Sequence, residues 1–189
     1  MPHARDALIA PSWSVLLARL GLALFAGCGA DDGAVPPVPC WPLDAAPGGS
    51  VELGTGDIYF APMPDTVTIE RNGTQSDPYL PIHARIRGLP PGDPNDFFDP
   101  TNPRTKVSAS IDDIGLVLGI DCPASIGYVP SPEADAFDML HSLRIGFGTN
   151  ALSQIDGRSA RLVVEVVGSN GLYARDERIV VLRAPPPTP

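Results

Sequence analysis

Histidine is the side chain best suited to proton transfer near neutral pH, and His83 and His141 lie well inside the chain. Paired with one of the many carboxylates, either histidine would suit a hydrolase. The motifs that usually accompany catalysis are missing, because the sequence has no G-x-S-x-G, H-E-x-x-H or C-x-x-C and no phosphate-binding loop with GKS or GKT. We therefore expect no enzymatic activity, no cofactor and no metal, with His141 as a partly buried structural residue. A hydrolase that uses His83 or His141 is the alternative.

The segment PPGDPNDFFDPTNPRTK, residues 90–106, is the second place where residue types suggest a site. Its aspartates and asparagine offer the oxygen ligands that calcium takes, but their spacing differs from that of an EF-hand and prolines stiffen the segment. We expect a solvated surface loop, with calcium binding as the alternative. We expect the two phenylalanines to fold back onto the domain, with an exposed contact point as the alternative. The candidate binding residues of this loop are Asp93, Asn95, Asp96, Phe97, Phe98 and Asp99.

Cys28 stands at the end of an uncharged run, LGLALFAG at residues 20–27. A run of this length suits the core of a signal peptide and falls far short of the roughly 20 residues needed to span a bilayer. The residues Phe25-Ala26-Gly27-Cys28 resemble the lipobox of bacterial lipoproteins, although Phe25 replaces the usual aliphatic residue. The resemblance implies cleavage after Gly27 and a lipidated Cys28, whose acyl chains would anchor the protein stably. An ordinary secretory signal or an uncleaved anchor is the alternative.

Cys40 and Cys122 are the two remaining cysteines, and an exported protein meets an oxidising compartment in which a disulfide can form. A bond between them would close a loop of roughly 80 residues and would stabilise the fold by about 4 kcal/mol in the chain-entropy model. Two free thiols, or a bond to another chain, are the alternatives that the sequence leaves open.

The charge of the chain limits its partners. There are 13 basic and 22 acidic residues, which give a formal net charge of −9. Residues 1–27 contain Arg5, Arg19 and Asp6, so the 162 residues after them carry a charge of −10. This charge makes nucleic acid a poor partner and disfavours direct adhesion to anionic lipid. We therefore expect contact with a membrane only through lipid on Cys28.

Four segments follow from the composition: a lipoprotein signal peptide at residues 1–27, a tether rich in Pro, Gly and Ala at 28–47, a β-sandwich domain at 48–183 and a Pro-rich tail at 184–189. The domain shows the period-two alternation of apolar residues that is typical of β-strands. Turns are expected at Asn72-Gly73 and, in type I′ form, at Asn170-Gly171 within a hairpin. The expected strands lie at residues 51–53, 67–69, 80–86, 107–111, 116–120 and 140–147, with the hairpin at 161–182.

Three further expectations concern the surroundings of single segments. In residues 80–86, alternation places His83 and Arg85 on the outward face of the strand. Residues 116–120 form a short apolar run that suits a strand buried on both faces. Residues 131–141 suit one short helix.

Short strands separated by turns predict an all-β fold, an antiparallel β-sandwich. The final run GRSARLVVEVVGSNGLYARDERIVVL, residues 157–182, resembles the last two strands of immunoglobulin-like and PKD-like bacterial modules. VELGTGDIYFAPMP at 51–64 and PYLPIHARIRGL at 78–89 are similar to uncharacterised envelope lipoproteins of myxobacteria. These resemblances imply an immunoglobulin-like fold and a place in the cell envelope, and they imply no activity.

The residue after Cys28 bears on the membrane in which the protein would reside. In enteric lipoproteins an aspartate at that position favours retention in the inner membrane, whereas this chain has Gly29. By that resemblance the outer membrane is favoured. The sequence thus predicts a lipid-anchored protein of the bacterial cell envelope, which presents a non-enzymatic β-sandwich to an envelope protein or polysaccharide.

Overall fold

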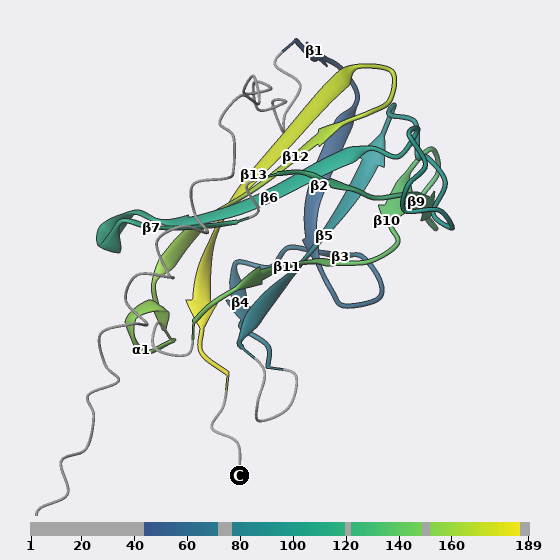
Figure 1. Cartoon of the computed structure of the whole chain (residues 1–189). Helices are drawn as coiled ribbons and strands as arrows, with labels where there is room; N and C mark the ends of the chain where they lie inside the picture. Colours follow the sequence, from purple (N-terminus) through teal and green to yellow (C-terminus); the bar gives the residue numbers. More distant parts are fainter. Residues whose placement is uncertain (1–43, 72–76, 120–121, 149–151, 186–189) are drawn as a thin grey trace, which may run out of the picture. The chain divides into compact units, whose positions relative to one another are not determined.

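The computed structural model describes residues 44–71, 77–119, 122–148 and 152–185, all within the compact unit Pro39–Pro189. These residues form two β-sheets that enclose one hydrophobic core, which confirms the predicted all-β sandwich (Figure 1). Among them, helix is limited to the 3-10 turn η1 (Asp112–Ile114) and the single turn α1 (Leu152–Ile155). No helix in these segments is long and apolar enough to cross a membrane. The relation to immunoglobulin-like modules stays a prediction.

The first sheet contains, within the described segments, seven strands in the order β1-β13-β12-β6-β7, with β4 pairing to β13 and β8 to β6. The pairs that β13 makes with β1 and β4 are parallel, and the other pairs are antiparallel. The strands are β1 (Ala46–Pro47), β4 (Thr66–Thr68), β6 (Arg104–Ile111), β7 (Leu116–Gly119), β8 (Ala124–Ser125), β12 (Ser159–Val167) and β13 (Leu172–Arg183).

The second sheet contains six described strands in the order β3-β2-β5-β10-β9, with β11 also pairing to β5. All of its pairs are antiparallel. The strands are β2 (Ser50–Thr55), β3 (Ala61–Pro62), β5 (Tyr79–Arg87), β9 (Tyr128–Pro130), β10 (Phe137–Met139) and β11 (Leu143–Gly146). β5 is therefore the central strand, with β2 on one side and β10 and β11 on the other.

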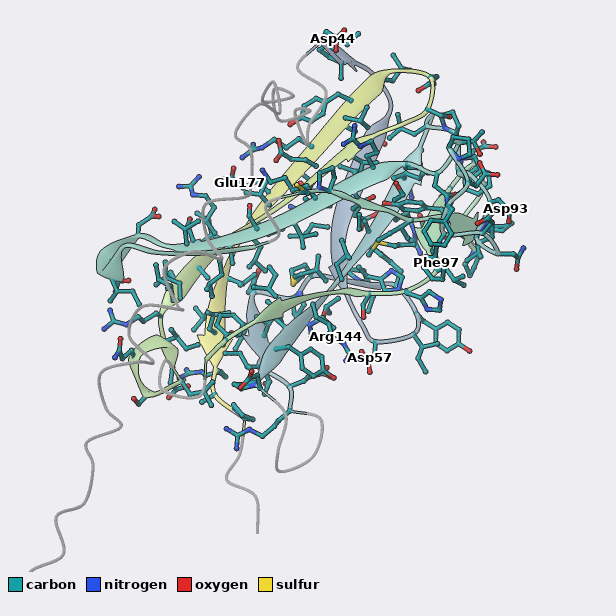
Figure 2. All side chains as sticks on the ribbon, in the orientation of Figure 1. Asp44, Asp57, Asp93, Phe97, Arg144 and Glu177 are labelled. Carbon is teal, nitrogen blue, oxygen red and sulfur yellow. The ribbon has the colours of Figure 1, made fainter. Side chains whose placement is uncertain are left out.

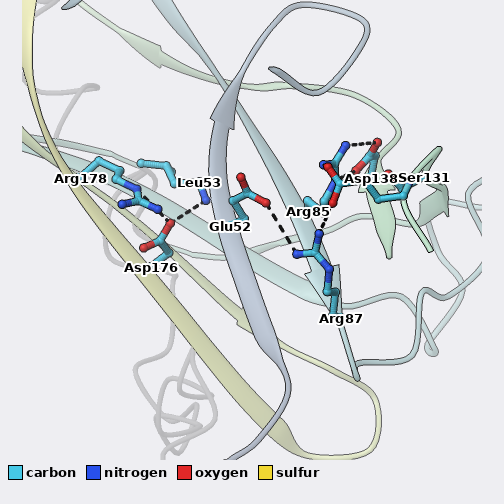
Figure 3. Close-up of polar contacts among 9 residues, drawn as sticks. Glu52, Leu53, Arg85, Arg87, Ser131, Asp138, Asp176 and Arg178 are labelled. Atoms are coloured by element: carbon cyan, nitrogen blue, oxygen red, sulfur yellow. Dashed lines mark hydrogen bonds and ion pairs between the residues drawn. The ribbon is translucent and has the colours of Figure 1, made fainter. Parts of the chain in front are cut away.

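The core lies between the sheets and consists of aliphatic side chains from the long strands. Ile82 and Ile86 of β5 are fully buried, as are Leu162 and Val164 of β12. A polar contact also joins the sheets, because the Leu53 backbone N–H on β2 donates to Asp176 Oδ2 on β13 at 2.8 Å (Figure 3). Apolar burial of this kind supplies the main stabilisation of the sandwich.

The hairpin predicted at residues 161–182 is present as β12 and β13, but the type I′ turn is wrong. Val167 pairs with Tyr173, and the Gly168 N–H donates to the Leu172 carbonyl at 2.9 Å, so the loop is longer than two residues. Only Gly171 in this loop has a positive φ, at 75°, whereas type I′ requires positive φ at both central residues. Asn170 instead accepts a hydrogen bond from the Leu172 N–H through its side chain at 3.1 Å, which stabilises the longer loop.

The outward face predicted for β5 is also wrong. His83 and Arg85 are buried, with 0 % and 6 % of their surface exposed. Alternation distinguishes the two faces of a strand but does not show whether the second face is covered. Phe60, from the segment after β2, covers this face and contacts both His83 and Arg85.

Two other segments differ from their prediction. The described part of the run predicted at 116–120 is β7, which is not buried on both faces, because it pairs only with β6 among the described strands and Val117 is 75 % exposed. The helix expected at 131–141 is replaced by β10, which pairs with β9 and β5. Asp135 has a positive φ of 58°, a backbone conformation that a right-handed helix excludes.

Several predicted features fall outside the described residues. These are the signal peptide at 1–27 with Cys28, the turn at Asn72-Gly73, the end of the tail and Cys40. Cys122 is disulfide-bonded, and its pairing with Cys40 stays a prediction. Near the end of the predicted tether, Ala46–Pro47 forms β1 and pairs in parallel with β13.

Candidate functional site

A cleft of about 480 Å³ lies over the face of β5 that points away from the core. Its walls come from the segment after β2, from β9, and from β10 with the residues that follow it. The lining is mainly apolar, with a few polar side chains among it. The lining residues are Asp57, Ile58, Tyr59, Phe60, His83, Val129, Pro130, Pro132, Asp138, Met139, Leu140 and His141.

His83 lines this cleft from β5 and is fully buried. Neither Nδ1 nor Nε2 makes a hydrogen bond of good geometry in the described part of the chain, although backbone groups of Ile58 and Ala84 lie near the ring. Burial lowers the pKa of His83, and the nearby Asp138 carboxylate together with the backbone of Ala84 and Ile58 opposes this shift only in part. The imidazole is therefore neutral at pH 7, with one nitrogen as donor and the other as acceptor.

The Phe60 ring packs against the His83 ring. It meets the imidazole edge-on, with centroids 6.2 Å apart and planes at 81°. Gly54 in β2 makes room for this ring, since a Cβ there would lie 2.3 Å from Phe60 Cε2. The absence of a side chain at Gly54 thus allows the Phe60 ring to lie against His83.

A buried ion pair forms the next layer of the site. Arg85 on β5 and Asp138 on β10 are paired across the ladder, with Nε to Oδ1 at 2.6 Å and Nη2 to Oδ2 at 3.1 Å (Figure 3). Hydrogen bonding to Asp138 raises the pKa of Arg85, although burial acts in the opposite direction. The guanidinium also lies over the Phe60 ring, 4.1 Å from its centroid. This pair fixes β5 to β10 and so holds the cleft wall in place.

Glu133 extends this network to the protein surface. It forms ion pairs with both Arg85 and Arg87, and Arg87 Nη1 also lies 3.6 Å from Glu52 Oε2. The Glu133 backbone N–H donates to Ser131 Oγ at 3.2 Å. All of these charges are paired, which indicates a structural role for the network.

Large apolar side chains are exposed on two loops: the segment after β2, whose residues line the cleft, and the loop at 93–99, which reaches the cleft through Phe97. Ile58 and Tyr59 are 69 % and 82 % exposed, and Phe97 and Phe98 are 58 % and 93 % exposed. Phe97 stacks on His141, with centroids 5.9 Å apart and planes at 15°, and His141 lines the cleft. Figure 2 shows Phe97 and Asp57 on the loops that flank this region. We call Ile58, Tyr59, Phe97 and Phe98 the aromatic rim.

Two expectations about this region are wrong. Phe98 is 93 % exposed and does not fold back onto the domain, whereas Phe97 stacks on His141 and stays 58 % exposed, so a role as a contact point stays a prediction. His141 was expected to be partly buried but is exposed. His141 instead stacks with Phe97 at the surface.

The loop that carries Asp93, Asp96 and Asp99, which we call the acidic loop, uses these aspartates to cap its own backbone. Asp93 Oδ1 accepts from the Asn95 N–H at 2.8 Å, Asp96 Oδ1 from the Phe98 N–H at 2.8 Å, and Asp99 Oδ1 from the Thr101 N–H at 2.7 Å. These are Asx turns repeated every three residues. Hydrogen bonds from the Thr101 hydroxyl and backbone lower the pKa of Asp99. The carboxylates therefore serve separate turns, and the described residues contain no group of three or more His, Cys, Asp or Glu that could hold a metal.

Asn102 closes this loop and was missed in the sequence. It is 3 % exposed, its Oδ1 accepts from the Asp93 N–H at 2.8 Å, and its Nδ2 donates to the Asp96 carbonyl at 2.6 Å. The sequence does carry one signal for Asn102, because this residue continues the three-residue spacing of Asp93, Asp96 and Asp99. Asn102 thus fixes the loop that carries half of the aromatic rim.

The structure therefore brings only some of the predicted site residues together at the cleft. Both histidines line one cleft, but neither is hydrogen-bonded to a carboxylate within the described segments. The loop residues 93–99 meet the cleft through the contact of Phe97 with His141. Comparisons of the chain with models of protein families, with curated proteins and with solved structures found no match.

Proposed function

We propose that this chain is a lipid-anchored protein of the bacterial cell envelope whose β-sandwich binds a partner and carries out no chemical step. The aromatic rim around the cleft is the observation that carries this proposal. The partner is an envelope protein or polysaccharide. The rim and the apolar cleft beside it favour a protein, because buried apolar and aromatic contacts dominate the energetic centres of protein interfaces.

The distribution of exposed apolar residues supports a binding role. Six large apolar side chains are exposed in the described part of the chain, and four of them form the aromatic rim. The other two, Val117 and Ile179, lie singly on β7 and β13. Scattered exposed apolar residues are normal, whereas a cluster beside a cleft is typical of an interaction site.

The proposed anchor rests on the sequence around Cys28. The uncharged run at 20–27 and the residues Phe25-Ala26-Gly27-Cys28 resemble a lipoprotein signal. The negative charge of the chain disfavours adhesion to anionic lipid, so membrane attachment requires acyl chains. Gly29 after the cysteine favours the outer membrane by the same resemblance.

A hydrolase using His83 or His141 is the competing function. Acid–base catalysis requires a histidine within hydrogen-bond reach of the substrate and oriented by a neighbour. The contacts of His83 and His141 with Phe60 and Phe97 are aromatic rather than polar, which favours binding over catalysis. Loss of a hydrolytic activity on replacing either histidine by alanine, with the fold intact, would favour the hydrolase.

Cell fractionation tests the envelope location directly. Wild-type protein and Cys28→Ala are compared in membrane and soluble fractions, and intact cells are treated with protease. We expect wild-type protein in the membrane fraction and the variant outside it, and protease sensitivity then assigns the surface or the periplasm. Soluble wild-type protein, or a variant bound to the membrane as strongly as wild type, would contradict the anchor.

A further inference from the structure

The aromatic rim offers exposed rings beside an apolar cleft. Tyr59 is 82 % exposed and lines the cleft of about 480 Å³, and Phe98 is 93 % exposed on the acidic loop. A partner that covers these rings and fills the cleft removes apolar surface from water, which favours binding. The charges around the rings then determine which partner fits.

The segments around the rim and the cleft carry carboxylates and no Lys or Arg. These segments are residues 56–64, 90–103 and 130–142. Their acidic residues are Asp57, Asp93, Asp96, Asp99, Glu133, Asp135 and Asp138. The surface that they form is therefore acidic.

Neighbouring arginines neutralise only some of these carboxylates. Asp57, Glu133 and Asp138 each form an ion pair with an arginine. The ion pairs of the described residues include no aspartate of the acidic loop. Hydrogen bonds from Thr101 lower the pKa of Asp99, which keeps this carboxyl ionised at pH 7. The acidic loop therefore places uncompensated negative charge next to the aromatic rim.

This charge excludes several occupants of the rim. Anionic lipid and acidic polysaccharide would be repelled, and a second copy docked through the same surface would bring like charges together. A cationic partner would be attracted. Because the rings and the cleft walls are apolar, the partner also needs apolar side chains, and a segment of protein supplies both kinds.

The chain itself shows how a cation combines an aromatic ring with a carboxylate. The Arg85 guanidinium lies 4.1 Å from the Phe60 ring centroid, and Asp138 accepts a hydrogen bond from the same guanidinium. Phe98 presents the same two groups to an outside cation, because its N–H donates to Asp96 Oδ1 at 2.8 Å. A cation over the exposed Phe98 ring is attracted by both groups.

We infer that the aromatic rim binds a basic segment of the partner protein, with an Arg or Lys side chain over the Phe98 ring and an apolar side chain in the cleft. The aspartates of the acidic loop attract and orient this segment. The inference rests on the proposed function, because it names the chemistry of the partner that the same rim binds.

Titration of the purified full-length protein with three matched peptides tests the inference. Each peptide has five residues and blocked ends, and leucine alternates with arginine, with citrulline or with glutamate. Citrulline keeps the length of arginine but has no charge. We expect the arginine peptide to bind about tenfold more tightly than the citrulline peptide, and the glutamate peptide to bind most weakly. NMR shifts give the dissociation constants and should map binding to residues 57–60 and 93–99.

A triple variant of the acidic loop separates charge from structure. Asp93→Asn/Asp96→Asn/Asp99→Asn removes three charges, but each asparagine oxygen can still accept the backbone hydrogen bond that closes its turn. We expect this variant to prefer the arginine peptide by about twofold or less. An unchanged midpoint in urea denaturation shows that the variant is folded.

Three aspartates outside these segments provide a charge-matched control. Asp77→Asn/Asp112→Asn/Asp156→Asn removes the same number of charges from exposed positions. This variant should keep the full preference for the arginine peptide, because solvent and salt screen charges that lie away from the rim.

Four results would overturn the inference: equal affinity of wild type for the arginine and citrulline peptides, no saturable binding of the arginine peptide, an undiminished preference in the acidic-loop variant, or an equal loss of preference in the control variant. Saturable binding of neutral chitohexaose at the rim in place of the arginine peptide would also overturn it and would assign the rim to a polysaccharide.

Cross-linking through position 98 in intact cells distinguishes this failure from failure of the proposed function. A captured partner without a preference for the arginine peptide would contradict only the basic segment. A preference for the arginine peptide without any captured partner would contradict only the proposed function.

Discussion

At the scale of single residues, the ion pair between Arg85 and Asp138 dominates the candidate site. Both side chains are buried, so removing one partner leaves the other charge in a medium that solvates it poorly. We expect Arg85→Ala to lower the free energy of unfolding by about 3–5 kcal/mol in urea denaturation. The double variant Arg85→Met/Asp138→Leu should recover much of this loss, because it removes both charges together.

Arg158 provides a matched control for that prediction. It pairs with Asp113, and both side chains are substantially exposed. Exposed pairs contribute about 0–1 kcal/mol, so Arg158→Ala should lower the free energy of unfolding by less than about 1 kcal/mol. A loss for Arg85→Ala as small as that for Arg158→Ala would show that the buried pair is dispensable.

His83 links stability to pH at the same scale. Its pKa is lowered in the folded state, so the unfolded chain binds the proton more readily. The contribution of His83 is complete above its unfolded pKa of about 6.5, and it is lost as the pH falls from there towards the folded pKa. Protonation of His83 can change the unfolding free energy by at most about 1.4 kcal/mol per pH unit.

The measurement is urea denaturation between pH 7.5 and pH 5. Asp138 and His141 are the ionisable neighbours that act electrostatically on His83. We expect His83→Leu to show a shallower loss of stability than wild type. The linkage would be wrong if the His83→Leu curve ran parallel to that of wild type.

At the scale of elements, the acidic loop depends on Asn102. Its side chain satisfies the Asp93 N–H and the Asp96 carbonyl, and both would lose a partner in Asn102→Ala. We expect a loss of about 2–3 kcal/mol in unfolding free energy and faster amide hydrogen exchange across residues 93–99. Asn95→Ala, whose exposed side chain donates only to Asp93 Oδ1, should cost less than about 1 kcal/mol. Equal effects of the two substitutions would contradict this role of Asn102.

The elements also show how far the sequence alone could go. Alternation predicted the strands at 80–86 and 107–111 and the final hairpin, because these strands are long and pair over most of their length. It could not predict the burial of His83, because coverage of the second face of β5 depends on Phe60, a contact distant in sequence. The exposure of β7 likewise depends on its place at the sheet edge, which strand order decides.

The candidate site was predictable only in part. The loop at 93–99 stood out through its composition, and the structure brings Phe97 to His141. Ile58 and Tyr59 gave no signal, because their segment has neither strand alternation nor a motif. The cleft itself forms only when segments distant in sequence meet around β5.

At the scale of the whole molecule, we propose that lipid on Cys28 anchors the protein to the membrane and that the aromatic rim binds the partner. Tyr59 and Phe98 are the most exposed members of this rim, so their replacement should leave the fold unchanged. We expect Tyr59→Ala to change the unfolding free energy by less than about 0.5 kcal/mol, as exposed positions usually do. The same variant should weaken partner binding about tenfold or more, as aromatic residues at interface centres do.

The central claim is tested most directly by site-specific photo-cross-linking in intact cells. A photoreactive phenylalanine replaces Phe98 or, as the control, Ile179, an exposed apolar residue on β13. We predict a discrete adduct from position 98 that falls about tenfold when Tyr59→Ala is added, and no such adduct from position 179. The mass of the adduct then assigns the partner to a protein or to a polysaccharide. No adduct from position 98, or the same adducts from both positions, would contradict a binding function for the aromatic rim.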